Sequence, residues 1–374
     1  MASALVLIAS AVLWDAARAP GSDPLIVKLG VWGRAHGLGF AITAYEQVRY
    51  KLNPPRVGGT ATISPTATPT ATIESKQDLQ PIPPVASGEP IPHEGVWQPV
   101  VVRAGKPLVH VAYLRPDSTH TSYLTAVMLF DHQHTRLQLH PGYEDPGDVK
   151  KFAVADRITT DMYSSVVAAF PGGFKVSDAR GGFYLNGHTV GRLQAGSASL
   201  VTYRDGRVDI GEWGSRVAMS PDVTSVRQNL KLLVDHGRVT ASAEAAVKSN
   251  WGATLDGVHY VWRTGVGIRA DGDVVFAVGD SLSARTLAHV LHAAGAVRAM
   301  QLDINPDWAA GYWFTQPTSG SSSRRPLAHK VLDFKKPLYR WFSATSRDFY
   351  SVHFVSRTDG ADKSRSPVPS PSVN

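Results

Sequence analysis

Short apolar runs separated by turn residues recur between residues 108 and 302, and this pattern is typical of β-strands. Two pairs of runs flank Asp205-Gly206 and Asp271-Gly272, dipeptides that favour the tight turn of a β-hairpin. The pattern therefore predicts hairpins that join into a sheet. The expected strands are Leu108–Leu114, Thr125–Phe130, Val166–Phe170, Ser199–Tyr203, Val208–Trp213, Val261–Ile268, Val274–Val278 and Ala299–Leu302.

Apolar residues at helical spacing predict one clear helix, over Ser283–Ala294. Ser281 or Ser283 can cap its first turn, and Gly295 stands where a left-handed residue ends a helix. The apolar face of this helix consists of Leu287, Val290, Leu291 and Ala294.

A second helix is expected over Val226–Val234, ending near Gly237. Hairpins combined with a few helices favour an α+β fold. We therefore expect a single domain built on a mixed, largely antiparallel sheet with a few packed helices.

The N-terminal segment has the pattern of a targeting sequence. Ala2–Trp14 is almost entirely apolar, and Ala17-Arg18-Ala19 follows it, which is typical of a secretory signal or a short signal anchor over residues 1–19. An ordinary buried helix is the alternative, because no Lys or Arg precedes the apolar run. We expect an extracellular or cell-surface protein, either secreted or anchored in the membrane by this segment.

The remaining boundaries follow from composition. Residues 20–53 form a juxtamembrane segment with an amphipathic helix over Trp32–Tyr50, which Asn53-Pro54-Pro55 must end because proline cannot continue a helix. Residues 54–92 are rich in Pro and Thr and predict a semi-rigid spacer. The folded domain is expected over residues 93–358, and a disordered Ser/Pro-rich tail over residues 359–374.

Composition excludes several classes of function. The 374 residues are 43% hydrophobic and 18% charged, which is a globular composition. Because cysteine is absent, disulfides, thiolate metal sites and cysteine nucleophiles are excluded. No stretch of 18 apolar residues exists, which argues against a multi-span membrane protein. The motifs of serine hydrolase elbows, phosphate-binding loops, dinucleotide folds and zinc proteases are missing, and we expect no cofactor.

Two places could carry chemistry. Asp303 ends a short predicted strand and leads into a polar loop with Asn305 and Trp308, although such residues also cap ordinary turns. Gly172-Gly173 follows another predicted strand and precedes Phe174; paired glycines let backbone N–H groups approach an anion closely, and they also form plain turns.

A metal site is not expected. His132 and His134 would point to the same face of a strand, and His140 is near in sequence. No third ligand stands at a suggestive spacing, so the two histidines are interpreted as solvated loop residues.

Read together, these segments resemble the phosphodiester glycosidase family, whose best-known member removes N-acetylglucosamine from a sugar phosphodiester. The resemblance spans roughly residues 166–308 and looks closest to a secreted bacterial branch. Two departures are present: Pro171 stands where the family usually has Asn before Gly-Gly-Phe, and Ile304-Asn305-Pro306 follows the Leu-Asp pair. The matching pieces are Ala168–Phe174, Arg263–Ile268 with Asp271-Gly272, Ala288–Gly295 and Met300–Asp303.

The resemblance carries Asp303 and Arg263 onto the family's motif positions and implies a carbohydrate or sugar-phosphate substrate. Our hypothesis makes Asp303 the nucleophile or general base, and Arg263 the group that binds phosphate through its planar guanidinium. The Gly172-Gly173 backbone would position sugar or phosphate oxygens. Weaker candidates for lining or stacking are Phe174, Arg227, Gln228, Asn250, Trp251, Asn305 and Trp308.

Two alternatives stay open. One is a non-catalytic module that binds anionic cell-envelope polymer, because residues 324–365 hold ten Lys or Arg against four Asp or Glu within a net charge of +7. Nucleic acid is not expected as a partner, since no recognition motif appears. The other is a two-carboxylate glycosidase on ordinary wall polysaccharide, with Glu212 or Asp307 as the second acid.

Overall fold

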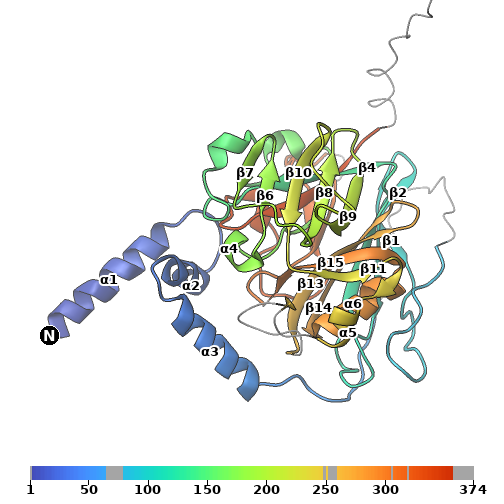
Figure 1. Cartoon of the computed structure of the whole chain (residues 1–374), viewed down its shortest axis with the longest axis horizontal. Coiled ribbons are helices and arrows are strands. Elements are labelled where there is room, and N and C mark those ends of the chain that lie inside the picture. Colours follow the sequence, from blue (N-terminus) through green and yellow to red (C-terminus); the bar gives the residue numbers. More distant parts are fainter. Residues whose placement is uncertain are drawn as a thin grey trace, which may run out of the picture.

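Three antiparallel sheets form the body of the protein in a computed structural model that describes residues 2–64, 79–246, 250–251, 259–304, 306–317 and 320–356 (Figure 1). The largest sheet has the order β1-β2-β3-β14-β13-β15-β11-β12. Its strands are β1 Gln98–Arg103, β2 Lys106–Leu114, β3 Thr125–Phe130, β11 Leu232–Asp235, β12 Arg238–Val239, β13 Val261–Arg269, β14 Val274–Leu282 and β15 Ala296–Ile304.

Two five-stranded sheets complete the domain, in the orders β17-β16-β5-β18-β4 and β7-β6-β10-β8-β9. The first contains β4 Thr135–His140, β5 Val166–Pro171, β16 Tyr312–Thr315, β17 Leu327–Lys330 and β18 Phe349–Phe354. The second contains β6 Phe183–Leu185, β7 His188–Val190, β8 Ala198–Tyr203, β9 Val208–Glu212 and β10 Val223–Gln228.

The helices are short apart from those at the N-terminus and α6. They are α1 Ala2–Arg18, α2 Leu25–Ala35, α3 Gly39–Leu52, α4 Val176–Ala179, α5 Ala241–Glu244 and α6 Ala284–Ala293, with 3-10 turns at Val149–Phe152, Thr160–Met162 and Arg340–Phe342. Together the sheets and α6 give the α+β domain that the sequence predicts, and the pairings between its described strands are antiparallel.

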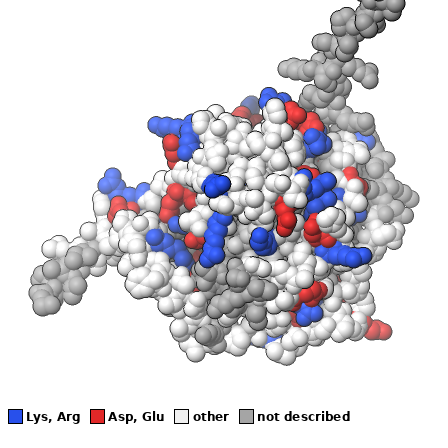
Figure 2. Space-filling view, viewed as in Figure 1, with Lys and Arg blue, Asp and Glu red and all other residues white. Residues whose placement is uncertain are grey.

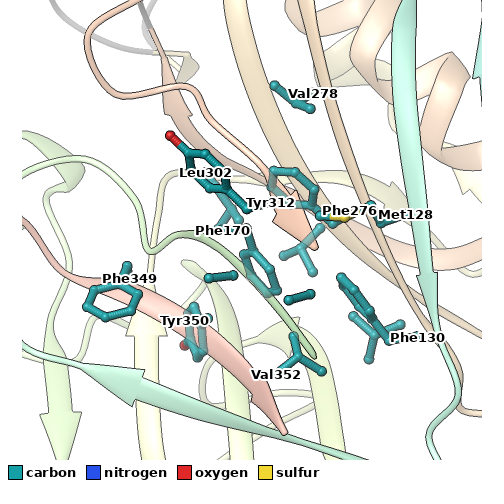
Figure 3. Close-up of a cluster of buried hydrophobic side chains, with 14 of the residues drawn as sticks. Met128, Phe130, Phe170, Phe276, Val278, Leu302, Tyr312, Phe349, Tyr350 and Val352 are labelled. Atoms are coloured by element: carbon teal, nitrogen blue, oxygen red, sulfur yellow. The ribbon is translucent and has the colours of Figure 1, made fainter. Parts of the chain in front are cut away.

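The core has two layers, one on each face of the large sheet. On one face, Phe276 of β14 and Phe130 of β3 pack against Phe170 of β5, with ring centroids 4.8 and 5.9 Å from that of Phe170 (Figure 3). On the other face, α6 covers Val275 and Ala277 of β14. Burial on both faces explains why these strands read as nearly continuous apolar runs.

The helix α6 begins and ends as predicted. Ser283 caps it and forms a capping box with Thr286, while Ser281 lies outside the helix. Gly295 follows with a φ of +91°, the conformation in which glycine costs least. Its apolar side is buried against the large sheet.

The predicted helix over Val226–Val234 is wrong. Val226 lies in β10 and Val234 in β11, and Leu230 between them has a φ of +58°, which breaks the chain direction. The apolar spacing arises because Val226 and Val234 are buried in different sheets, so a strand-turn-strand segment imitates helical periodicity.

The N-terminal region forms three helices that lie beside the domain (Figure 1). The amphipathic helix expected over Trp32–Tyr50 is divided between α2 and α3 by Gly37, which has a φ of +80°. As predicted, α3 ends just before Asn53. Among the described residues, no helix is long and apolar enough to span a membrane.

The described parts of the Pro/Thr-rich segment lie against the domain. Ile63 and Ile82 are buried, and Ile82 N donates to Gly95 O. The composition predicts a semi-rigid spacer, but Ile82 is buried in the core beside α6, so the described part of this segment packs against the domain. Residues 65–78 and the tail over residues 359–374 lie outside the described residues.

Candidate active site

Asp303 lies near the end of β15 and is 3% exposed. Its Oδ1 accepts a hydrogen bond from Ile304 N at 3.1 Å, and its Oδ2 lies 3.4 Å from Arg347 Nη2. Burial raises the pKa of Asp303 to about 6, although the positive charge of Arg347 opposes that rise. A carboxyl group with this pKa exchanges its proton near neutral pH, as a catalytic acid or base requires.

Arg347 is the guanidinium that faces this carboxyl group. It stands just before β18, donates from Nη2 to Gly173 O at 2.7 Å, and has its Nε 3.8 Å from Asp145 Oδ2. Its guanidinium carbon lies 5.0 Å from the centre of the Trp308 ring. The sequence offers one signal for this residue, an Arg-Asp pair directly before an apolar strand, but Arg347 also lies within the basic stretch over residues 324–365 that predicts a polymer-binding surface.

A second ion pair, fully buried, lies next in sequence to the pair of Asp303 and Arg347. Arg227 of β10 and Asp348 are joined by a hydrogen bond from Nε to Oδ2 at 2.6 Å, and neither side chain is exposed. Burial disfavours the charge on Arg227, but attraction to Asp348 outweighs it and raises the pKa of Arg227. Arg227 also donates to Phe174 O, so it fixes the loop beside Arg347.

The backbone of the Gly172-Gly173-Phe174 bend holds Asp348 and the two arginines. Gly172 N donates to Asp348 O, while the carbonyls of Gly173 and Phe174 accept from Arg347 and Arg227. A Cβ at position 172 would lie 2.0 Å from Asp348 Oδ2, so only glycine fits there. Neither glycine lines the cavity described next; Gly172 is hydrogen-bonded to Asp348 and Gly173 to Arg347.

A cavity of about 650 Å³ opens beside Asp303. The domain contributes one wall, and α2 and α3 contribute the other with mainly apolar residues such as Val27 and Ile42. The lining residues from the domain are Phe174, Lys175, Asp178, Asp303, Ile304, Asp307, Trp308 and Arg347.

Three cations surround Trp308 in this region. Besides Arg347, Arg340 lies 5.1 Å and Lys336 5.6 Å from the ring centre. Burial and the nearby Arg340 lower the pKa of Lys336 to about 8. Asp23, from the segment before α2, lies 3.4 Å from Lys336 and 4.0 Å from Arg340. The arrangement suits an anion held beside an aromatic face.

The structure does not bring Arg263 into this cavity. Its side chain is fully buried and donates to Leu282 O, Gln301 Oε1 and His259 O. Asp303 is therefore faced by Arg347, where the sequence placed Arg263. The sequence does not show which of the two arginines faces Asp303. Arg347 reaches Asp303 from the loop before β18, a strand of a different sheet that is distant in sequence.

The other predicted residues divide into two groups. Phe174 and Trp308 line the cavity together with Asp303. Gln228 instead braces a buried loop through Gly182 N and Gln194 N, and Asn250 donates to Ser242 Oγ. Trp251 is fully buried against α6, so it does not stack in the cavity. Asn305 lies outside the described residues.

Of the two acids proposed for a second carboxylate, Asp307 lines the cavity and Glu212 does not. The side chain of Asp307 is half exposed and its Oδ1 lies 3.9 Å from Lys336 Nζ. A carboxyl group is thus present on the rim of the same cavity that holds Asp303 at its inner wall.

Comparison with known proteins gives one family match. No curated protein matches the sequence. Among solved structures, the zebrafish N-acetylglucosamine-1-phosphodiester alpha-N-acetylglucosaminidase catalytic domain, auto-inhibited by its pro-peptide, aligns at 15% identity with a TM-score of 0.41 over 69% of this chain and 87% of that one. A hypothetical protein from Synechocystis aligns at 9% identity with a TM-score of 0.37 over 67% and 63%. The family model for phosphodiester glycosidase matches residues 164–303, so over this stretch the chain resembles that family, as its motifs predict.

Proposed function

We propose that this protein hydrolyses the glycosidic bond of a sugar 1-phosphodiester. The observation that carries the proposal is Asp303, a buried carboxyl group with a raised pKa that faces Arg347 on the wall of a cavity. The family match over residues 164–303 supports the same reaction class. We further propose that the protein acts outside the cytoplasm on a cell-envelope glycan, on the basis of its N-terminal apolar segment.

The chemistry needs few groups. Water adds to the anomeric carbon while the bond from that carbon to the phosphate oxygen breaks, and the electron pair leaves with the phosphate monoester. Because a phosphate monoester has a second pKa near 6, it leaves with little help from a general acid. Asp303 can therefore act alone, either accepting the proton of the attacking water or forming a transient ester with the sugar.

The cations around Trp308 would hold the phosphate. Arg347 lines the cavity and offers a planar pair of donors, while the buried Lys336 and Arg340 add positive charge near the same ring. Negative charge grows on the leaving phosphate as the bond breaks, so these groups stabilise the transition state more than the substrate.

The test is Asp303→Asn, assayed on a sugar 1-phosphodiester with the full chain. We expect kcat to fall at least about a thousandfold with the fold retained, because Asn can neither attack nor accept the proton. Asp307→Asn is the matched control, since this carboxyl group lines the same cavity. Wild-type turnover in Asp303→Asn would remove the residue from the mechanism.

A two-carboxylate glycosidase is the second candidate, favoured by the presence of Asp307 on the same cavity. The same pair of variants discriminates. If Asp307 supplies the general acid, Asp307→Asn loses hydrolysis of a plain glycoside by a similar factor. Under the phosphodiester proposal, Asp307→Asn keeps activity within about tenfold of wild type.

A further inference from the structure

Two turns at one end of the large sheet bring a histidine and two carboxylates together. Asp131 and His132 follow β3, and Asp273 lies between β13 and β14. One ligand atom from each of these three residues lies within 4.8 Å of the others. The two turns are neighbours because β3 pairs with β14, with Phe130 opposite Val274.

Asp273 is the unusual member of the group. It is 2% exposed, and its Oδ1 accepts from His132 N at 3.0 Å and lies 2.8 Å from His132 Nδ1. Its Oδ2 is buried and has no hydrogen-bond partner among the described residues. A buried carboxylate oxygen without a partner is costly, and a cation beside it removes that cost.

The neighbours hold the cluster in place. Asp131 Oδ2 lies 2.6 Å from His134 Nδ1, and its Oδ1 accepts from Gln133 N at 2.9 Å. Asp273 N donates to Asp271 Oδ1. Arg136 donates to the carbonyls of His132 and Thr135 rather than to either carboxylate. Such outer contacts orient ligands in known metal sites.

We propose that Asp131, His132 and Asp273 form a binding site for a divalent transition metal, with Zn²⁺ as the preferred ion. One imidazole and two carboxylates suit Zn²⁺, whereas Ca²⁺ needs six or more oxygens. The side chain of His132 is 40% exposed, so solvent and the ion reach the site. The sequence did not predict this site because Asp273 is 141 residues from His132.

This site is separate from the candidate active site. Arg263, near Asp303, and Arg269, near Asp273, stand at opposite ends of β13, roughly 20 Å apart at the rise of a strand. The metal would join two turns and stabilise them, and the hydrolysis proposed above does not depend on it.

The test is calorimetric titration of the tag-free full chain, stripped with chelator, with Zn²⁺, Mn²⁺ and Ca²⁺ at pH 7.5. We expect one Zn²⁺ per chain, weaker Mn²⁺ binding and no detectable Ca²⁺ binding. Asp273→Asn and His132→Gln should each weaken Zn²⁺ binding by at least about tenfold. The control is His236→Gln, since His236 pairs with Asp235 in the same way and no third ligand among the described residues is in reach.

A second measurement covers the case in which Asp273→Asn fails to fold. Saturating Zn²⁺ should raise the Tm of wild type and of His236→Gln by about 5 °C and leave that of His132→Gln unchanged. Absence of stoichiometric Zn²⁺ binding to wild type, or equal affinity in His132→Gln, overturns the proposal. Hydrolase activity should be the same in wild type and His132→Gln.

Discussion

Ionised Asp303 destabilises the folded state, because its charge is buried. Its carboxyl group is removed from water, and the partial compensation from Arg347 leaves its pKa about two units above the value of roughly 3.9 for an unfolded chain. Between these two values the folded state binds the proton more tightly than the unfolded state. The free energy of unfolding therefore falls as pH rises from about 4 to about 6.

This sign gives a prediction for Asp303→Asn. Asparagine carries no charge, so the variant does not lose stability when pH rises through the pKa of Asp303. At pH 7.5 its free energy of unfolding should exceed that of wild type by up to about 3 kcal/mol. At pH 4 the advantage should largely disappear. Urea unfolding at both pH values measures the difference, and a difference that does not change with pH would mean that the carboxyl group is not perturbed as described.

The pH profile of hydrolysis follows from the same residues. Asp303 must be ionised to attack or accept a proton, so kcat/KM should rise with pH up to about 6. Lys336 must be protonated to bind phosphate, so kcat/KM should fall above about 8. In Lys336→Met the fall at high pH should vanish, and a fall that persists would assign it to another group.

At this scale the sequence predicts Asp303 and Trp308 but not their partners. A carboxylate at the end of a strand can be predicted, because the apolar run and the acid are neighbours in the sequence. Arg347 and Asp348 reach the site through pairing of β18 with β5, a contact between residues far apart in the sequence. Arg263 lies on β13, next to the strand that carries Asp303, but its side chain is buried and bonds to protein groups. The local sequence does not show whether such an arginine binds substrate or stabilises the fold.

Among the elements, the glycine bend after β5 packs directly against the buried ion pair of Arg227 and Asp348. A methyl group at position 172 would overlap Asp348 Oδ2 and separate it from Arg227. Breaking a buried ion pair is expensive, so Gly172→Ala should lower the free energy of unfolding by about 3 kcal/mol or more. Gly39→Ala is the control, because a Cβ there meets open space. Chemical unfolding of both variants provides the comparison.

The segment before α2 has an electrostatic effect on the cavity. Asp23 lies beside Lys336 and Arg340, two of the cations proposed to bind phosphate. Its carboxylate competes with the substrate, so Asp23→Asn should lower KM for a sugar phosphodiester by roughly tenfold, or about 1.4 kcal/mol. Initial-rate kinetics test this, with Asp15→Asn, in α1, as the control. An unchanged KM would place the phosphate elsewhere.

Element prediction worked best where a turn signal and a period agree. Both hairpins at Asp-Gly turns are present, as β8-β9 and β13-β14, and α6 has its predicted caps. It failed over Val226–Val234, where burial in two sheets produced a helical spacing. Periodicity reports which side chains are buried, and it does not report which layer buries them.

For the molecule as a whole, the α+β class follows from the sequence, whereas the path of the Pro/Thr-rich segment does not. Ile82 belongs to the core between the large sheet and α6. On the face in Figure 2, Lys and Arg are interspersed with Asp and Glu, without a single-sign patch. Lys336, Arg340 and Arg347, part of the basic stretch expected to face an anionic polymer, are buried near the cavity.

A truncation series tests the packing of that segment. A chain that begins at residue 79 keeps Ile82, whereas one that begins at residue 93 lacks it. Burial of this side chain contributes about 2 kcal/mol to the free energy of unfolding. The Tm of the shorter chain should therefore be lower by roughly 5 °C. Equal Tm values in thermal denaturation would mean that the segment adds no stability.

The position of β18 has a consequence for biosynthesis. This strand is the last among the described residues, yet it lies inside its sheet, between β5 and the edge strand β4, and Arg347 and Asp348 directly precede it. A nascent chain on the ribosome consequently lacks the partner of Asp303 until residue 347 is made, and an interior strand of this sheet until residue 354 is made. Premature termination would leave β5 and β4 without the strand between them, and the open sheet would be a natural target for proteolytic quality control.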